Sequence, residues 1–204
     1  MTIRFHKGDL PDLSRYTSSA AIDTETLGLN PHRDRLCVVQ LSPGDGTADV
    51  VQISRDQREA PNLARLLADE CIEKIFHFAR FDIAVLYNAF SAMTTPVYCT
   101  KIASRLVRTY TDRHGLKDIT RELLGVDLSK QQQSSDWAAS ELSQAQLEYA
   151  ASDVLHLHQL KARLDMMLER ENRVELAQAA FRFLPWRARL DLAGWPEEDI
   201  FSHS

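Results

Sequence analysis

The chain has 204 residues, of which 44% are hydrophobic and 26% charged, and its formal net charge at pH 7 is −5. This composition is typical of a globular protein, and no apolar run approaches the about 18 residues of a membrane span. The acidic balance argues against binding nucleic acid through the average field of the molecule.

The predicted elements change in type along the chain. Strands are expected at residues 3–6, 18–24, 36–41 and 49–53, and the turn residues 43–46 predict a hairpin between the last two. Then follow a helix opened by Pro61, a strand over 74–78, a helix over 81–90 and a strand over 97–99. Helices are expected over 100–107, 116–124, 143–171 and 174–183. A meander followed by alternating strands and helices predicts an α/β domain with a mixed sheet flanked by helices.

The cysteines and the N-terminal residues bear on the compartment. Cys37, Cys71 and Cys99 have no CxxC spacing and do not pair with histidines at zinc-ligand spacing, so we expect small core residues. The first residues lack the apolar segment of a secretory signal. We therefore expect a cytoplasmic protein in a reducing compartment, with no membrane attachment.

The run Ala21-Ile22-Asp23-Thr24-Glu25 is the most informative feature of the sequence. Side chains two residues apart on a strand point the same way, so Asp23 and Glu25 are predicted to lie side by side. Two carboxylates that close are unfavourable unless a cation or a shared proton lies between them. No Lys or Arg follows before Arg33, so a metal ion is the natural partner. The alternative is a pair of acids on a loop or at a helix start.

Two further segments offer acidic side chains. Asp82 lies just past the strand expected at 74–78, in the first turn of a helix, where an acid also favours the helix dipole. Tyr149 and Asp153 are four residues apart on a helix and face the same way. A tyrosine–aspartate hydrogen bond on a half-exposed helix is the alternative there. Four carboxylates from three elements could hold divalent cations if the fold brings them together. Oxygen ligands favour Mg²⁺ or Mn²⁺, and two such ions could serve phosphoryl displacement.

These residues resemble the DEDD 3′–5′ exonucleases of the ribonuclease H-like fold. Asp23 and Glu25 match the first motif, Asp82 the second, and Tyr149 with Asp153 the third, where tyrosine marks the DEDDy branch. The resemblance is greatest to ribonuclease D and covers residues 18–165. It implies one exonuclease domain over residues 1–204, with a core at about 18–165 and a helical extension at about 166–204. Ribonuclease D has helical nucleic-acid-binding modules after this core, and the few residues after 165 are too short for one.

The resemblance also implies roles for the site. Asp23, Glu25 and Asp153 would hold the metal beside the attacking water, and Asp23 with Asp82 the metal near the leaving oxygen. Tyr149 would align the water. The backbone amides of Thr24 and Thr26, with the apolar side chain of Leu27, would grip the terminal nucleotide. His77, Phe78 and Phe81 would stack or hydrogen-bond near the 3′ end, and Lys130 and Gln132 would reach a phosphate. For the aromatic residues core packing is the alternative, which we favour for Phe76 and Trp137.

The predicted activity is metal-dependent hydrolysis from the 3′ end of single-stranded nucleic acid, with RNA favoured. Two alternatives remain open. One is a single-strand DNA exonuclease, since only contacts to the 2′ hydroxyl discriminate the sugar. The other is a catalytically silent nucleic-acid-binding scaffold, which would bind without hydrolysis.

Overall fold

Six strands form one mixed sheet in the computed structural model, which describes residues 2–129 and 131–203. The strands are β1 (Thr2–Lys7), β2 (Ser19–Thr26), β3 (Leu36–Ser42), β4 (Thr47–Gln52), β5 (Glu73–Phe76) and β6 (Val97–Cys99). Their order across the sheet is β1-β4-β3-β2-β5-β6. Strand β3 runs antiparallel to β2 and β4, whereas the pairs β1–β4, β2–β5 and β5–β6 are parallel. The predicted mixed sheet and the hairpin of β3 with β4 are confirmed, and the predicted N-terminal strand, β1, lies at one edge of the sheet.

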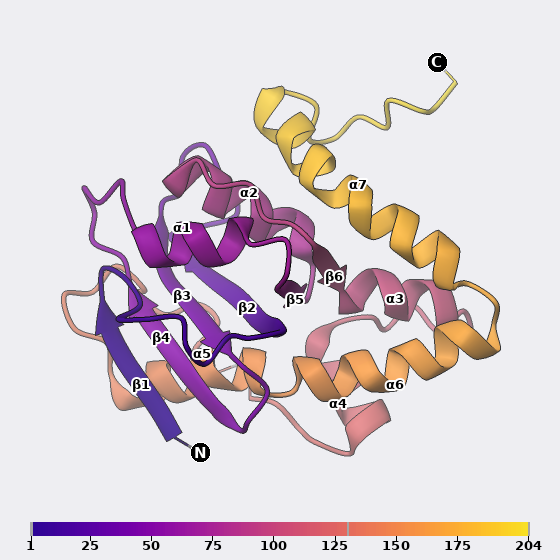
Figure 1. Cartoon of the computed structure of the whole chain (residues 1–204), viewed down its shortest axis with the longest axis horizontal. Coiled ribbons are helices and arrows are strands. Elements are labelled where there is room, and N and C mark those ends of the chain that lie inside the picture. The colour runs from indigo at the N-terminus through magenta and orange to yellow at the C-terminus, as the bar shows by residue number, and fades with distance from the viewer. Residues whose placement is uncertain (1, 130, 204) are drawn as a thin grey trace.

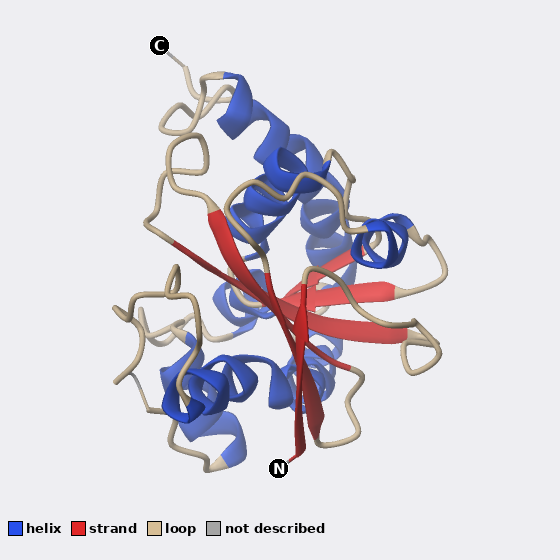
Figure 2. Ribbon diagram, turned by 90° about the vertical axis from the view of Figure 1, so that its left-hand side faces the viewer, coloured by secondary structure: helices blue, strands red, loops and turns tan. Residues whose placement is uncertain are grey.

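Helices cover the sheet and extend beyond it, as Figures 1 and 2 show. They are α1 (Pro61–Ala68), α2 (Ala79–Phe90), α3 (Thr100–Val107), α4 (Leu116–Leu124), α5 (Gln144–Leu155), α6 (Leu157–Arg170) and α7 (Val174–Ala193). Helix α5 packs against β2, β3 and β4, whereas α6 packs mainly against α3 and α7 mainly against α2. Among the described helices, none has the length and hydropathy that crossing a membrane requires.

The central strands are buried along most of their length. All seven residues of β3 are buried, and Ala20, Ala21 and Ile22 of β2 have no exposed surface. A strand that is buried on both faces of the sheet loses the alternation of apolar and polar residues. After Ser19 at its start, β2 is apolar until Asp23, which is only partly buried.

The helix predicted over residues 143–171 is two helices. The chain turns at His156, which has φ −103° and ψ −5° and separates α5 from α6. In Figure 1, α5 lies beneath the sheet and α6 runs away from it toward α3. No glycine or proline marks the break, so the apolar periodicity continued across it and concealed the change of direction.

Two further expectations need correction. Helix α7 does not end at Phe183 but continues through Pro185, and it buries Leu184, Pro185 and Ala188. Cys71 is exposed, whereas Cys37 and Cys99 are buried as expected.

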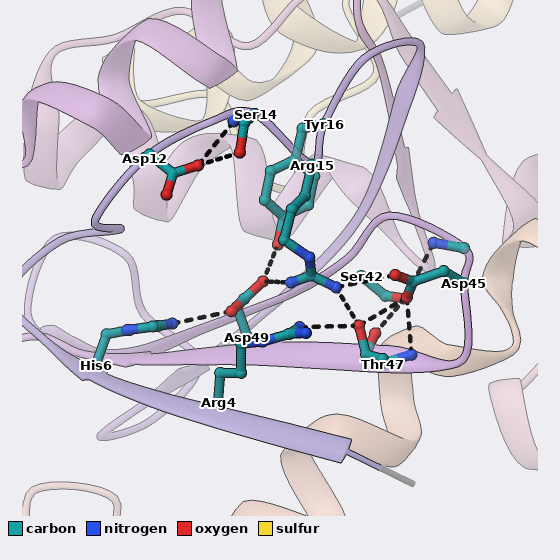
Figure 3. Close-up of polar contacts among 11 residues, drawn as sticks. Arg4, His6, Asp12, Ser14, Arg15, Tyr16, Ser42, Asp45, Thr47 and Asp49 are labelled. Atoms are coloured by element: carbon teal, nitrogen blue, oxygen red, sulfur yellow. Dashed lines mark hydrogen bonds and ion pairs between the residues drawn. The ribbon is translucent and has the colours of Figure 1, made fainter.

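A buried carboxylate joins the N-terminal segment to the sheet (Figure 3). Asp49 of β4 accepts hydrogen bonds from His6 Nε2 at 2.9 Å and Tyr16 Oη at 2.7 Å, and it pairs with Arg15. Since Asp49 is 3% exposed, these three partners compensate the cost of burying its charge. This network fixes the edge of the sheet opposite β6, away from the carboxylates described next.

Candidate active site

Three carboxylates converge where β2 leaves the core. Asp23, Glu25 and Asp153 each offer one oxygen, and these oxygens lie within 4.8 Å of one another. Asp23 and Glu25 are two residues apart on β2, and α5 carries Asp153 across the sheet to meet them. The predicted side-by-side arrangement is therefore present, and a third acid from a distant part of the chain completes it.

Asp82 lies beside this trio and is more deeply buried. It belongs to the first turn of α2 and is 3% exposed. Thr24 Oγ1 donates a hydrogen bond to Asp82 Oδ1 at 2.7 Å. Asp82 is thus not a solvent-exposed helix-start acid, because its carboxylate points at β2 rather than at water.

The acids strongly perturb one another. Burial raises the pKa of Asp23 to about 7. Burial and then the charges of Asp23, Asp153 and Asp82 raise the pKa of Glu25 to about 10. The pKa values of Asp82 and Asp153 lie well above the ordinary range, through burial first and the charge of Asp23 second. Without a cation, the cluster therefore retains protons at neutral pH.

The donor set fits a hard divalent cation. Among the described residues, no Lys, Arg or His forms an ion pair with any of these four carboxylates. All the donors are carboxylate oxygens, which suit Mg²⁺ or Mn²⁺ better than softer metals. A cation between three close carboxylates would offset the cost of burying their charge, which is the main cause of their raised pKa values, and would also offset the repulsion that Glu25 and Asp153 experience.

Tyr149 faces the same cluster as a protonated phenol. Burial, followed by the charges of Asp153, Glu25 and Asp23, raises its pKa above the ordinary value of 10. Its ring lies 6.0 Å from that of Trp137, which is 2% exposed and packs behind it. Tyr149 can therefore orient a water molecule through its hydroxyl, and it is poorly suited to act as a base. Trp137 is buried, in agreement with the packing role expected for it.

An open cleft of about 710 Å³ leads to these acids. Its lining includes five of the residues predicted to grip a nucleotide, namely Thr24, Thr26, Leu27, His77 and Phe81. Leu27 is 53% exposed at the cleft. Gln132 does not line the cleft, because its side chain accepts a hydrogen bond from Ser135. Lys130 lies outside the described residues.

Phe78 lies next to the cleft rather than in it. It has φ +71° at the start of α2, is 47% exposed and lines a neighbouring groove with Arg105 and Phe183. Lys101 Nζ lies 4.4 Å from the centre of its ring, and Lys101 also lines the cleft, so the two cavities adjoin there. Phe76, in contrast, is fully buried in the core.

His77 is held in one orientation at the cleft wall. Its Nδ1 lies 2.9 Å from Thr100 Oγ1. Burial, and then the charge of Lys101, lowers the pKa of His77 to about 3. The imidazole is therefore neutral at neutral pH, and it offers hydrogen bonding rather than charge to a ligand.

The sequence did not point to several residues that the fold brings to the site. Gln40 of β3 donates from Nε2 to Asp23 Oδ2 at 2.6 Å. Lys101, Gln133 and Ser134 line the cleft. A polar side chain in an otherwise apolar strand was the only sequence signal for Gln40, and no local pattern distinguishes the other three.

Comparison with known proteins places the chain among nucleases. Residues 11–169 match the family model described as 3′-5′ exonuclease. A ribonuclease D of Granulibacter bethesdensis is 35% identical over 153 residues, which are 75% of this chain and 38% of that protein. The DNA polymerase I of Aquifex aeolicus is 37% identical over 147 residues, 72% of this chain and 24% of that protein. The chain thus spans about two fifths of the length of the ribonuclease D relative.

A solved structure matches the chain along its whole length. The structure of Brucella melitensis NrnC with bound Mg²⁺ has 67% sequence identity and a TM-score of 0.97, and the match covers 100% of both chains. The same protein has been solved bound to pGG, with 68% identity and a TM-score of 0.98. The agreement extends over α7 as well as over the part that the family model matches.

Proposed function

Because the chain belongs to the 3′–5′ exonuclease family, we propose that it is a metal-dependent enzyme that hydrolyses single-stranded RNA from its 3′ end. The observation that carries this proposal is the convergence of Asp23, Glu25 and Asp153 within 4.8 Å, with Asp82 beside them. A cluster of buried acids without a basic partner is unfavourable in itself, and a cation between the acids relieves that cost.

The positions of the acids support the roles that the family resemblance implies for them. When bound, two divalent cations supply positive charge to the attacking and leaving oxygens of a phosphoryl displacement. Asp23, Glu25 and Asp153 would hold one cation, and Asp23 and Asp82 would hold the other. The hydroxyl of Tyr149 positions the attacking water, because its raised pKa keeps the proton on the phenol.

The cleft wall holds the terminal nucleotide. Leu27, an exposed apolar side chain, contacts the base of the terminal nucleotide. The backbone amides of Thr24 and Thr26 bind the same nucleotide. His77 and Phe81, which also line the cleft, bind as a neutral hydrogen-bonding ring and an apolar ring. Phe78 remains a proposed contact near the 3′ end, and Lys130 and Gln132 remain proposed contacts to a phosphate.

RNA is the favoured substrate class. The ribonuclease D relative supports RNA, and the structure of NrnC bound to pGG supports a nucleotide ligand in this fold. The similarity to a DNA polymerase I keeps single-strand DNA as the second candidate. We further propose that residues 1–204 act as one exonuclease domain. A cytoplasmic location is part of the proposal, since free thiols stay reduced there.

A time course on end-labelled single strands tests the proposal. An RNA and a DNA of identical sequence, each labelled at the 3′ or the 5′ end, are incubated with Mg²⁺, Mn²⁺ or EDTA. We expect a metal-dependent ladder from the 3′ end of RNA and little product from DNA. The Asp23→Asn variant is the inactive control.

The other outcomes separate the alternatives. Equal ladders on both strands would indicate an exonuclease that does not discriminate the sugar. Binding of both strands without cleavage would indicate a silent scaffold. Undiminished cleavage by Asp23→Asn would contradict the assignment of the site.

A further inference from the structure

Gln40 is a buried amide directly opposite the first carboxylate of the site. It is the register partner of Asp23 in the antiparallel pair of β2 and β3 and has no exposed surface. Its Nε2 donates to Asp23 Oδ2 at 2.6 Å. On either side of it, β3 carries the apolar residues Val39 and Leu41.

We propose that Gln40 is a positioning residue that acts through Asp23. By holding Oδ2, the amide fixes the carboxylate in the orientation that turns its free lone pairs toward Glu25 and Asp153. The inference rests on the proposed function, because it assumes that these acids hold a divalent cation. It adds a residue that none of the three acidic motifs contains.

The direction of the hydrogen bond supports this role. An amide N–H donates more strongly to an ionised carboxylate than to a protonated one, so this bond favours the ionised form that a cation also requires. A carboxylate has about four acceptor positions, so one bond to Gln40 leaves positions for a cation. A group that hydrogen-bonds to a metal-binding side chain, without touching the metal itself, orients that side chain and tunes its affinity for the metal.

The stability of the fold alone does not explain the amide. Gln40 Oε1 is buried and has no hydrogen-bond partner among the described residues. An unsatisfied buried acceptor costs about 1–3 kcal/mol. An unbranched apolar side chain such as methionine would fill the same space without that cost. The amide is therefore explained by what its donor does, which is to hold Asp23.

The experiment compares metal binding with stability in the full chain. Wild type and Gln40→Met are stripped with EDTA, and Mn²⁺ binding is measured by calorimetry while thermal unfolding is followed in EDTA. We expect Gln40→Met to lose Mn²⁺ affinity about 10–100-fold, while its metal-free Tm stays equal or rises. A residue that only supports packing would lower the Tm and leave Mn²⁺ affinity unchanged.

Gln52→Met is the matched control. Gln52 lies on the neighbouring strand β4, and its Nε2 donates to the Ala139 carbonyl oxygen at 2.8 Å, away from the acids. We expect this variant to keep Mn²⁺ affinity within about twofold. Gln40→Asn keeps the amide but withdraws it by one methylene, so it should also lose affinity, and it replaces Gln40→Met if that variant does not fold.

Each result has one meaning. Unchanged Mn²⁺ affinity in both Gln40 variants would overturn the proposal, and so would an equal loss in Gln52→Met. Absence of Mn²⁺ binding by the wild type would instead refute the proposed metal site. Failure of Gln40 as a positioning residue and failure of the proposed function are therefore distinguishable.

Discussion

Thr24 Oγ1 donates to Asp82 Oδ1 at 2.7 Å and thereby joins the central strand of the sheet to the first turn of α2. Thr24 lies between Asp23 and Glu25 in sequence, so its side chain leaves β2 on the opposite face. The triplet Asp23-Thr24-Glu25 therefore supplies two carboxylates to the cleft and a hydroxyl that binds Asp82. Asp82 is fixed by the same strand that carries the first two carboxylates.

We predict that Thr24→Val lowers kcat/KM about 10–100-fold. Valine keeps the shape of threonine but removes the donor, which leaves the buried Asp82 carboxylate without its partner. The backbone amide proposed to contact the nucleotide is unchanged. Steady-state hydrolysis of a labelled oligonucleotide measures the effect. Thr120→Val, a buried threonine of α4 that bonds only to the Leu116 carbonyl oxygen, is the control and should retain activity.

Asp153→Asn should abolish most hydrolysis and stabilise the metal-free chain. Burial and the charge of Asp23 raise the pKa of Asp153, so folding without metal must bind a proton that the unfolded chain has released at neutral pH. Asparagine is neutral at every pH and removes this cost, so unfolding in EDTA should require a higher temperature. Loss of a residue that hydrogen-bonds to a metal-binding side chain typically costs up to about 100-fold in activity. Asp153→Asn should cost more, because it removes a carboxylate proposed to bind the metal. Calorimetry in EDTA and a hydrolysis assay measure the two effects. A lower Tm in EDTA would contradict the expectation that the Asp153 carboxyl group destabilises the metal-free chain.

The acids of the site were predictable because their positions follow from local rules. The period of a strand places Asp23 beside Glu25, and the period of a helix places Tyr149 beside Asp153. That these two pairs meet depends on how α5 crosses the sheet, for which the sequence offers no local signal. Only the resemblance of the ordered motifs to a known family predicted that they would come together.

Tyr149→Phe should slow hydrolysis less than Asp153→Asn does. The hydroxyl orients a water molecule, whereas the carboxylate holds a cation. A group that orients without transferring a proton should contribute less than the about 100- to 10,000-fold typical of a general acid or base. Because the pKa of Tyr149 is raised, the phenol should not ionise in the assay range, so the pH–rate profiles of the wild type and of Tyr149→Phe should have the same shape. The profiles of both enzymes under saturating Mg²⁺ measure this. Loss of a limb on the alkaline side would show that the phenol acts as a base.

The metal-free chain should lose stability as the pH rises. The pKa values of Asp23 and Glu25 are about 7 and about 10 in the folded chain, against ordinary values of 3.8 and 4.5. The folded chain thus binds protons that the unfolded chain releases, so the stabilisation is complete below about pH 4 and is lost as the pH rises through 7 and toward 10.

Thermal unfolding in EDTA between pH 5 and pH 9 measures this dependence. Saturating Mg²⁺ should reduce the decline, because the cation takes the place of the protons. The double variant Asp23→Asn, Glu25→Gln should have a flatter profile in EDTA. An equally steep decline in that variant would assign the effect to other groups.

Gln40 and Cys71 show where sequence reasoning fails for a physical reason. The register of the antiparallel pair decides that Gln40 faces Asp23, and a shift of one residue would point it to the other face. Cys71 follows a helix and precedes a strand, and only the packing of the connection leaves it exposed. Composition favours burial for a cysteine but does not specify register or loop path.

Gly28→Ala should weaken substrate binding through the loop that carries Leu27. A Cβ on Gly28 would lie 2.3 Å from Asp34 Oδ2, so Asp34 must move. Asp34 is 9% exposed and organises this loop, because it pairs with Arg33 and accepts a hydrogen bond from the backbone N–H of Asn30 at 3.0 Å. We therefore expect KM to rise about tenfold while kcat changes less, since the loss is in binding contacts rather than in the acids. Steady-state kinetics on a labelled oligonucleotide separates the two constants.

Gly125→Ala is the control. Gly125 has φ +70°, and a Cβ added there would have open space around it, so the substitution should cost about 1–2 kcal/mol of stability and leave KM unchanged. An unchanged KM in Gly28→Ala would show that the position of Leu27 does not depend on Asp34.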